Sequence, residues 1–193
     1  MTASRDEKWV RRTLAGSEEA FAEIVKRYQR PVFSIIVRMV RDAGLAEDLT
    51  QETFIKAFRA LKSFDPKRKL SSWLFTIAHN TAIDHLRRKA LQTVPLEAES
   101  EGHDLLETLP AAGVDTPERA AMSRELAQAF ERELRAMRPE YAEILVLRFQ
   151  EGLAYEEISE VTGLPIGTVK THLFRARRQL AKRLARHGLT PGD

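Results

Sequence analysis

The sequence contains no cysteine, and this absence removes several kinds of chemistry at once. Disulfide frameworks, thiolate metal sites and cysteine nucleophiles all require that residue and are therefore excluded. Long apolar runs are missing too: residues 32–40 are interrupted by Arg38 and fall far short of the about 20 residues that span a bilayer. Residues 1–12 are polar and carry no apolar signal segment. We therefore expect a cytoplasmic protein with no membrane insertion.

Signatures of catalysis are equally absent. The sequence shows no glycine-rich phosphate loop and no evident arrangement of serine, histidine and acid. His79 and His85 are six residues apart, so they do not share a helix face as an i, i+4 metal-binding pair does. We expect no enzymatic activity, no cofactor and no metal site.

Alternation of apolar and polar residues, which is typical of strands, is not found, and helical periodicity prevails instead. Ser17 is expected to cap the first periodic segment, and Ser71 or Ser72 the fourth. The pattern predicts an all-α fold with helices near residues 17–30, 31–41, 45–62, 71–89, 118–137, 139–150, 155–162 and 166–186.

Charge is unevenly distributed along the chain. Residues 90–118 contain seven acidic residues and no lysine or arginine, together with several prolines and glycines, whereas residues 169–186 contain seven lysines and arginines and no acidic residue. Such asymmetry indicates a nucleic-acid-facing surface at the C-terminal end. We expect two small helical domains joined by a flexible acidic linker. The predicted boundaries are residues 1–90 for the first domain, 91–124 for the linker, 125–186 for the second domain and 187–193 for a tail.

Residues 155–180 carry the sharpest local signal. A short helix, a turn at Gly163-Leu164-Pro165 and a second helix have the spacing of a helix-turn-helix, whose second helix enters the major groove of DNA. At about 100° per residue, Ile166, Val169, Leu173, Ala176 and Leu180 fall on one face and are expected to pack inward. The opposite face and its flanks carry the candidate DNA contacts Thr168, Lys170, Thr171, Phe174, Arg175, Arg177 and Arg178.

An exposed phenylalanine beside threonine and arginine suits the edges of bases, because apolar groups meet thymine methyls and arginine forks onto guanine. Flanking cations suit phosphates. The alternative is a solvated basic face on which Phe174 makes a contact between domains. The segment from Thr168 to Leu173 also resembles the DNA-binding helices of response-regulator activators, so the N-terminal half must identify the kind of DNA-binding protein.

The predicted helix 45–62 has an inward face that includes Phe54 and Phe58. Its outward face places Ile55 among polar residues. This is the arrangement of a protein-binding surface, in which an apolar anchor is surrounded by a charged rim. A single stray exposed apolar residue is the alternative, and geometry alone does not separate the two. The polar residues around Ile55 are Asp48, Gln51, Glu52 and Arg59.

The next segment and the loop before it interleave aromatic and cationic residues. Single-stranded nucleic acid needs such a mixture, because aromatic faces stack on bases and cations hold the backbone. About half of the aromatic set is expected to serve the core instead. The candidate residues are Phe64, Arg68, Lys69, Ser72, Trp73, Phe75, Asn80, Arg87 and Arg88.

Taken together, residues 48–58 (DLTQETFIKAF) and 72–80 (SWLFTIAHN) resemble conserved region 2 of the extracytoplasmic-function sigma factors, and residues 165–177 (PIGTVKTHLFRAR) resemble their region 4. The resemblance covers residues 20–90 and 125–185, in the family's order. One departure is Ala154, where family members often have serine or threonine as a helix cap.

The resemblance implies roles that the residues alone do not establish. Asp48, Gln51, Glu52, Ile55 and Arg59 would bind the clamp helices of the largest subunit of core RNA polymerase, and region 4 would contact its flap. The loop and helix around Arg68 and Asn80 would capture the downstream promoter element, and the helix 166–186 would contact the upstream element. The acidic linker would enter the RNA channel, and an anti-sigma factor would be a further partner. The remaining alternative is a stand-alone helix-turn-helix activator, which would need a sensing domain that residues 1–90 lack strands to build.

Overall fold

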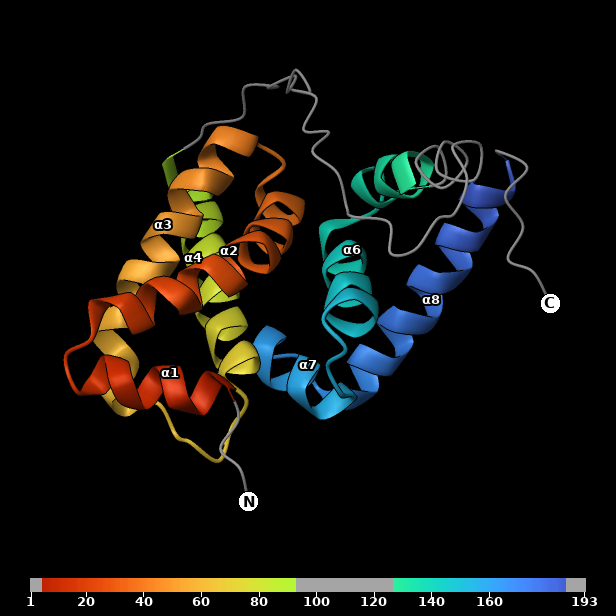
Figure 1. Ribbon diagram of the computed structural model, residues 1–193. Helices are drawn as coiled ribbons and strands as arrows, with labels where there is room; N and C mark the ends of the chain where they lie inside the picture. The colour runs from red at the N-terminus through yellow and green to blue at the C-terminus, as the bar shows by residue number, and fades with distance from the viewer. Residues whose placement is uncertain (1–4, 93–126, 187–193) are drawn as a thin grey trace, which may run out of the picture.

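The computed structural model describes residues 5–92 and 127–186, which form two groups of helices (Figure 1). The described residues include no β-strand, which confirms the all-α prediction. The predicted tail and all but the first two residues of the predicted linker lie outside the described residues. The first group comprises α1 (Arg5–Leu14), α2 (Glu18–Val40), α3 (Ala43–Ala60), the 3-10 turn η1 (Leu61–Ser63) and α4 (Leu70–Gln92).

Helix α2 is the centre of the first group and packs against α1, α3 and α4. Its side chains Ile24, Val32, Ile35 and Ile36 are almost completely buried. The periodicity did not predict α1, because this short helix is polar except for one narrow stripe. That stripe buries Val10 against the core, so tertiary packing rather than propensity stabilises the helix.

The predicted break between residues 30 and 31 is wrong, because α2 continues through Pro31. A proline removes one helical hydrogen bond, but burial of the apolar residues that follow it holds the helix together. Ser17 caps α2 as predicted: its Oγ accepts a hydrogen bond from the N–H of Ala20 at 3.3 Å. The predicted cap at Ser71 or Ser72 is wrong, since α4 already begins at Leu70.

The second group begins with a helix over residues 127–135, which is the described part of the predicted helix 118–137. The predicted helix 139–150 is two elements, because its last turn widens into a π-helical segment. Leu134, Ile144, Leu147 and Ile158 form the centre of the core of this group. The remaining elements are α6 (Pro139–Leu145), the π-helical turn η2 (Val146–Gln150), α7 (Tyr155–Thr162) and α8 (Ile166–Ala185).

The two groups contact each other directly. Helix α7 packs against α4, and α6 and η2 pack against α2 (Figure 1). The contact therefore places the first helix of the helix-turn-helix against the segment that carries the predicted single-strand-binding residues. Within the described ranges, no helix combines the length and apolarity that crossing a membrane requires.

Candidate functional site

Helix α3 carries the predicted polymerase-binding residues on its solvent face. Ile55 is 52% exposed, and Asp48, Gln51 and Arg59 are also exposed, while Glu52 is half-buried. The carboxylate of Glu52 forms an ion pair of 2.8 Å with Lys56. An apolar side chain thus lies in the open, surrounded by polar groups, as the helical geometry predicted.

Phe58 corrects one part of that prediction. It was expected to point inward, but it is 53% exposed, and its ring forms a T-shaped pair with Phe21 at 4.9 Å between centroids. Residues three apart on a helix are surface neighbours, so Phe58 extends the apolar surface of Ile55. The wheel position of Phe58, at the border between the two faces, was the signal that could have indicated this.

The aromatic residues of the predicted downstream-element site divide between surface and core. Phe75 is completely buried and its ring lies edge-on to Tyr28 at 6.3 Å, so its prediction as a DNA contact is wrong. Trp73 is partly buried and packs on Phe64, at 5.3 Å between ring centroids, and Phe64 itself is 9% exposed. Trp73 therefore remains the aromatic residue of this set with an accessible surface, supported from beneath by Phe64.

The amide of the same set lies in the middle of α4, and the cations lie near its two ends. Asn80, Arg87 and Arg88 are exposed along the helix. Asn80 and Arg87 are two helical turns apart and therefore share a face. At the other end, Arg68 and Lys69 lie in the loop before α4, and Ser72 lies in its first turn.

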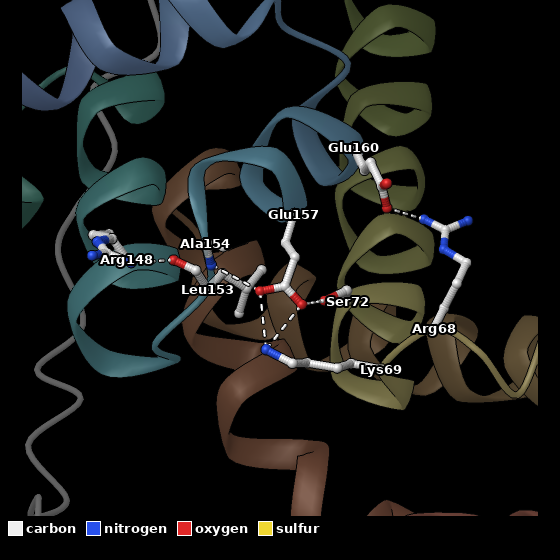
Figure 2. Close-up of polar contacts among 8 residues, drawn as sticks. All are labelled: Arg68, Lys69, Ser72, Arg148, Leu153, Ala154, Glu157 and Glu160. Atoms are coloured by element: carbon white, nitrogen blue, oxygen red, sulfur yellow. Dashed lines mark hydrogen bonds and ion pairs between the residues drawn. The ribbon is translucent and has the colours of Figure 1, made fainter.

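Figure 2 shows that these last three residues meet two glutamates of α7. Arg68 forms an ion pair with Glu160. Lys69 Nζ lies 3.1 Å from the carboxylate of Glu157, and Ser72 Oγ donates a hydrogen bond to the same carboxylate at 3.1 Å. Three residues predicted to bind DNA thus contact acidic side chains of the other group of helices.

Glu157 also contributes to the N-terminal cap of its own helix, α7. Its Oε2 accepts a hydrogen bond from the N–H of Ala154 at 2.8 Å, which forms half of a capping box. Burial raises the pKa of Glu157, but the hydrogen bonds from Ala154, Lys69 and Ser72 outweigh burial and hold that pKa below its ordinary value. The carboxylate is therefore kept charged where α7 meets α4.

The helix-turn-helix is formed as predicted. Gly163 ends α7 with φ of 69°, a left-handed conformation that glycine adopts without strain. The hydroxyl of Ser159 donates to the carbonyl of Leu164 at 2.6 Å and ties the turn to α7. Helix α8 follows from Pro165, which is its N-cap residue.

Helix α8 buries Val169, Leu173, Ala176 and Leu180, as its periodicity predicted. Ile166 is the exception: it was predicted to pack inward but is 37% exposed, and it is the first residue of α8, where no preceding helical turn covers it. Thr168 is half-buried. The other predicted DNA contacts of α8 are all exposed, namely Lys170, Thr171, Phe174, Arg175, Arg177 and Arg178.

Phe174 lies at the edge of an apolar groove as well as on the exposed face of α8. The groove runs between α8, η2 and the helix 127–135, and Phe130 and Phe149 also line it. Phe149 is 58% exposed and the guanidinium of Arg177 lies over its ring at 5.8 Å. Sequence reasoning did not single out Phe149, because the turn of η2 that exposes it interrupts the helical period.

His79 has a partner within the fold. Its Nδ1 lies 2.7 Å from the carboxylate of Glu143, and both side chains are largely buried where α4 meets α6. Among the residues that the structure describes, no group of three potential ligands could hold a metal ion.

Comparison with known proteins agrees with this arrangement. Residues 24–92 match Sigma-70 region 2 and residues 127–180 match Sigma-70, region 4. The chain is 36% identical over 180 residues to the ECF RNA polymerase sigma factor SigW of Bacillus subtilis, with 92% of this chain and 95% of that protein covered. It is 37% identical over 182 residues to the ECF RNA polymerase sigma-E factor of Escherichia coli, with 91% and 92% covered.

Solved structures show the same fold. The sigma factor RpoE of Bartonella quintana, in complex with the anti-sigma factor NepR, aligns with a TM-score of 0.65 and 25% identity over 86% of this chain and 96% of that chain. CnrH in complex with the cytosolic domain of CnrY aligns with a TM-score of 0.60 and 23% identity over 94% and 98%. The helix-turn-helix, the exposed face of α3 and the full-length similarity to two such proteins lead to one conclusion: the chain belongs to the extracytoplasmic-function RNA polymerase sigma factors.

Proposed function

We propose that this sigma factor binds core RNA polymerase through the exposed face of α3 and contacts its promoter at two separate elements. The observation that carries the proposal is the pairing of two surfaces on one chain. Ile55 and Phe58 form an apolar anchor with a charged rim, and α8 presents a cationic face from a helix-turn-helix. A DNA-binding protein that acts alone needs only the second surface, whereas an adaptor between polymerase and promoter needs both. Sigma factors act by binding and are not enzymes.

The polymerase-binding residues we propose are those around the anchor. Apolar side chains with polar rims typically supply most of the binding energy of a protein interface. The clamp helices of the largest subunit are the proposed contact for α3. The apolar groove beside Phe149 and Phe174 suits the polymerase flap. The proposed residues of the α3 surface are Asp48, Gln51, Glu52, Ile55 and Arg59.

We assign the downstream promoter element to the loop before α4 and to the outer face of α4. Trp73 offers an accessible aromatic surface for a base, and Asn80 offers an amide that can hydrogen-bond to a base edge. Capturing an unpaired base stabilises the open strand, so opening requires no hydrolysis, only about a few kcal/mol per unstacked base recovered in new contacts. The other proposed residues are Phe64, Arg68, Lys69, Ser72, Arg87 and Arg88.

The upstream element is assigned to α8. Arg175 and Thr171 lie on its exposed face and suit base edges, whereas Lys170, Arg177 and Arg178 suit phosphates. Two such weak contacts on one chain gain affinity from effective concentration, so two small domains can specify a promoter together.

An anti-sigma factor is the further partner that we propose, because RpoE and CnrH were each solved in complex with a partner protein. Partners of this kind would cover the polymerase-binding and DNA-binding surfaces. Because its targets are polymerase and DNA, we place the protein in the cytoplasm.

In vitro transcription tests the proposal. Purified core polymerase and a library of promoter fragments are combined with the wild-type protein, with Asp48→Lys or with Glu47→Lys. Asp48 lies two helical turns before Ile55 on the same face of α3, whereas Glu47 is another exposed acid of α3 that is not among the proposed contact residues. We expect specific transcripts with wild type and Glu47→Lys, and their loss with Asp48→Lys. Equal transcription by both variants would remove the α3 assignment, and DNA binding without any change in start sites would support a stand-alone activator.

A further inference from the structure

Lys56 lies between the proposed polymerase-binding face of α3 and the neighbouring helix α4. We infer that Lys56 is a positioning residue of that face: anchored on Thr81 of α4, it holds the carboxylate of Glu52 in place for a hydrogen-bond donor of core RNA polymerase. This inference rests on the proposed polymerase-binding surface, to which it adds two residues that act without touching the partner.

One nitrogen atom makes both contacts. Lys56 Nζ lies 2.8 Å from Oε1 of Glu52, one helical turn earlier on α3, and donates a hydrogen bond to Oγ1 of Thr81 at 3.1 Å. Helices α3 and α4 pack against each other (Figure 1). The amine therefore links a side chain on the outer face of α3 to the adjacent helix.

Thr81 is a fixed point for this link. It is 1% exposed, and its branched Cβ restricts the side chain to few rotamers in a helix. Two other buried threonines of this domain, Thr50 and Thr53, each donate the hydroxyl to the carbonyl one turn earlier, at 2.7 Å. The described hydrogen bond of Thr81 instead joins two helices, with its oxygen as the acceptor. Lys56 is thus held by a residue that cannot readily move.

This anchor distinguishes the ion pair from an ordinary surface pair. Lys56 and Glu52 keep 39% and 40% of their side chains exposed, and pairs this exposed usually contribute little because both side chains must be ordered. Here one partner is already held by a buried residue of another helix. Glu52 therefore loses part of its conformational freedom in the free protein, before polymerase binds.

The pairing leaves Glu52 able to bind a partner. A carboxylate offers two oxygens with about four acceptor positions, and Lys56 approaches Oε1. Oε2 can then accept a charge-assisted hydrogen bond from an arginine or lysine of the polymerase. A side chain that is already ordered loses less entropy on association, so the anchor should strengthen binding by about two- to tenfold.

The first test removes the anchor and keeps both charges. Thr81→Val replaces the hydroxyl with a methyl group of similar size, while Thr81→Ser keeps the hydroxyl and serves as the conservative rescue. Thr53→Val is the matched control, because Thr53 is 0% exposed on α3 and its described hydrogen bond stays within its own helix. Full-length proteins with an N-terminal fluorophore are titrated with core RNA polymerase, and circular dichroism and urea unfolding verify that each variant is folded.

We expect Thr81→Val to weaken binding by about two- to tenfold, whereas Thr53→Val and Thr81→Ser should bind like the wild type. Unchanged or tighter binding by Thr81→Val would overturn the inference. An equal loss with Thr53→Val or with Thr81→Ser would also overturn it, because the hydroxyl of Thr81 would then not be the cause.

The second test asks whether the effect acts through Glu52. Lys56→Met removes the amine at nearly constant side-chain length, and it provides the same measurement if Thr81→Val does not fold. In a Glu52→Ala background, neither Thr81→Val nor Lys56→Met should weaken binding further, because the group that they position is gone. A loss of equal size with and without Glu52 would make Lys56 or Thr81 an independent contributor to binding and would overturn the inference.

Glu52→Ala alone separates the inference from the proposed function. If this variant binds core polymerase as tightly as the wild type, the proposed contact of Glu52 is wrong and the positioning role fails with it. If Glu52→Ala weakens binding while Thr81→Val and Lys56→Met do not, the proposed contact stands and only the positioning role is wrong.

Discussion

Arg38 is the most deeply placed cation in the contact between the two domains. It is 7% exposed, it donates to the carbonyl and hydroxyl of Ser34 at 2.6 and 2.7 Å, and it pairs with Glu131 at 2.7 Å. Burial lowers the pKa of the guanidinium, and the carboxylate of Glu131 opposes that effect. Glu131 is the carboxylate that pairs directly with this buried cation, so the contact between the two domains depends on it.

Replacement of Glu131 by glutamine should therefore open the chain. The substitution removes a charge-assisted hydrogen bond worth about 1.5–3 kcal/mol, and Arg38 can regain water once the helix 127–135 leaves α2. Small-angle scattering should show a larger radius of gyration than in wild type, without loss of helix by circular dichroism. Glu140→Gln, which removes an exposed acid from α6, is the control and should leave the radius unchanged. A compact Glu131→Gln chain would contradict this role of the ion pair.

Ile55 allows a second prediction at the residue scale. Truncating an apolar anchor at the centre of an interface typically costs about 1–3 kcal/mol of binding, so Ile55→Ala should weaken core polymerase binding by about ten- to a hundredfold. Its free energy of unfolding should change by no more than about 0.5 kcal/mol, because the side chain is 52% exposed. Leu14→Ala is the matched control, since Leu14 is 49% exposed on α1. Fluorescence-anisotropy titration with core polymerase measures both variants, and equal affinities would place the anchor elsewhere.

At the scale of elements, α7 begins with an incomplete cap. Ala154 has the extended backbone of an N-cap residue, with φ of −69° and ψ of 162°, but its side chain has no acceptor. The side chain of Glu157 supplies the other half of the capping box by accepting a hydrogen bond from the N–H of Ala154. The sequence indicated the missing cap, but not that the compensating carboxylate would also bind Lys69 and Ser72 of the first domain.

Ala154→Ser should complete the capping box. Serine in this backbone conformation can accept from the N–H of Glu157 and should raise the free energy of unfolding by about 0.5–1 kcal/mol. Urea denaturation measures the change. Ala90→Ser makes the same substitution at an exposed position inside α4, where no cap is needed, and should give no gain. If the Ala154→Ser chain is no more stable than wild type, Glu157 alone satisfies the terminus.

Substitutions in α8 should distinguish residues that contact bases from residues that contact phosphates. Arg175→Ala should cost about 1–3 kcal/mol at one base position and relax specificity there, whereas Lys170→Ala should weaken all duplexes alike and lower the salt slope by about one. Binding of the polymerase holoenzyme to matched and single-substituted promoter duplexes, at several salt concentrations, distinguishes the two effects. A uniform loss with Arg175→Ala would make that residue a phosphate contact.

The elements show where sequence reasoning succeeded. The buried stripe of α8 and the exposed position of Ile55 were predicted because a long amphipathic helix fixes which face is buried. The errors lie at borders and ends. Phe58 and Ile166 are at the edges of their stripes, where neighbouring elements decide burial, and Phe75 serves the core because α2 packs over it. The pairing of Glu157 with Lys69 joins residues far apart in sequence, so no local pattern contained it.

At the scale of the whole molecule, we expect the chain to adopt two arrangements, one closed and one bound to polymerase. Closed, it hides Ser72 and pairs Arg68 with Glu160. In the proposed complex with polymerase, the loop before α4 and the face of α8 would contact separate promoter elements, which α7 packed on α4 does not allow. We therefore expect polymerase contacts to supply the energy that separates the domains, beginning at the exposed face of α3 that we propose as the polymerase-binding surface.

Locking the chain closed should therefore block initiation but not the first contact with polymerase. Cysteines introduced at Arg68 and Glu160 can be joined by a bis-maleimide with a reducible disulfide spacer, and the chain offers no other thiol. The joined protein should retain weak binding to core polymerase through α3, yet it should yield no promoter-specific transcripts. Cleaving the spacer with a reductant provides the matched control, because the same two substitutions remain while the domains are free to part. Transcription should then rise to the level of the protein labelled at one cysteine only. A joined protein that transcribes as well as the cleaved one would mean that α7 can stay on α4 throughout initiation.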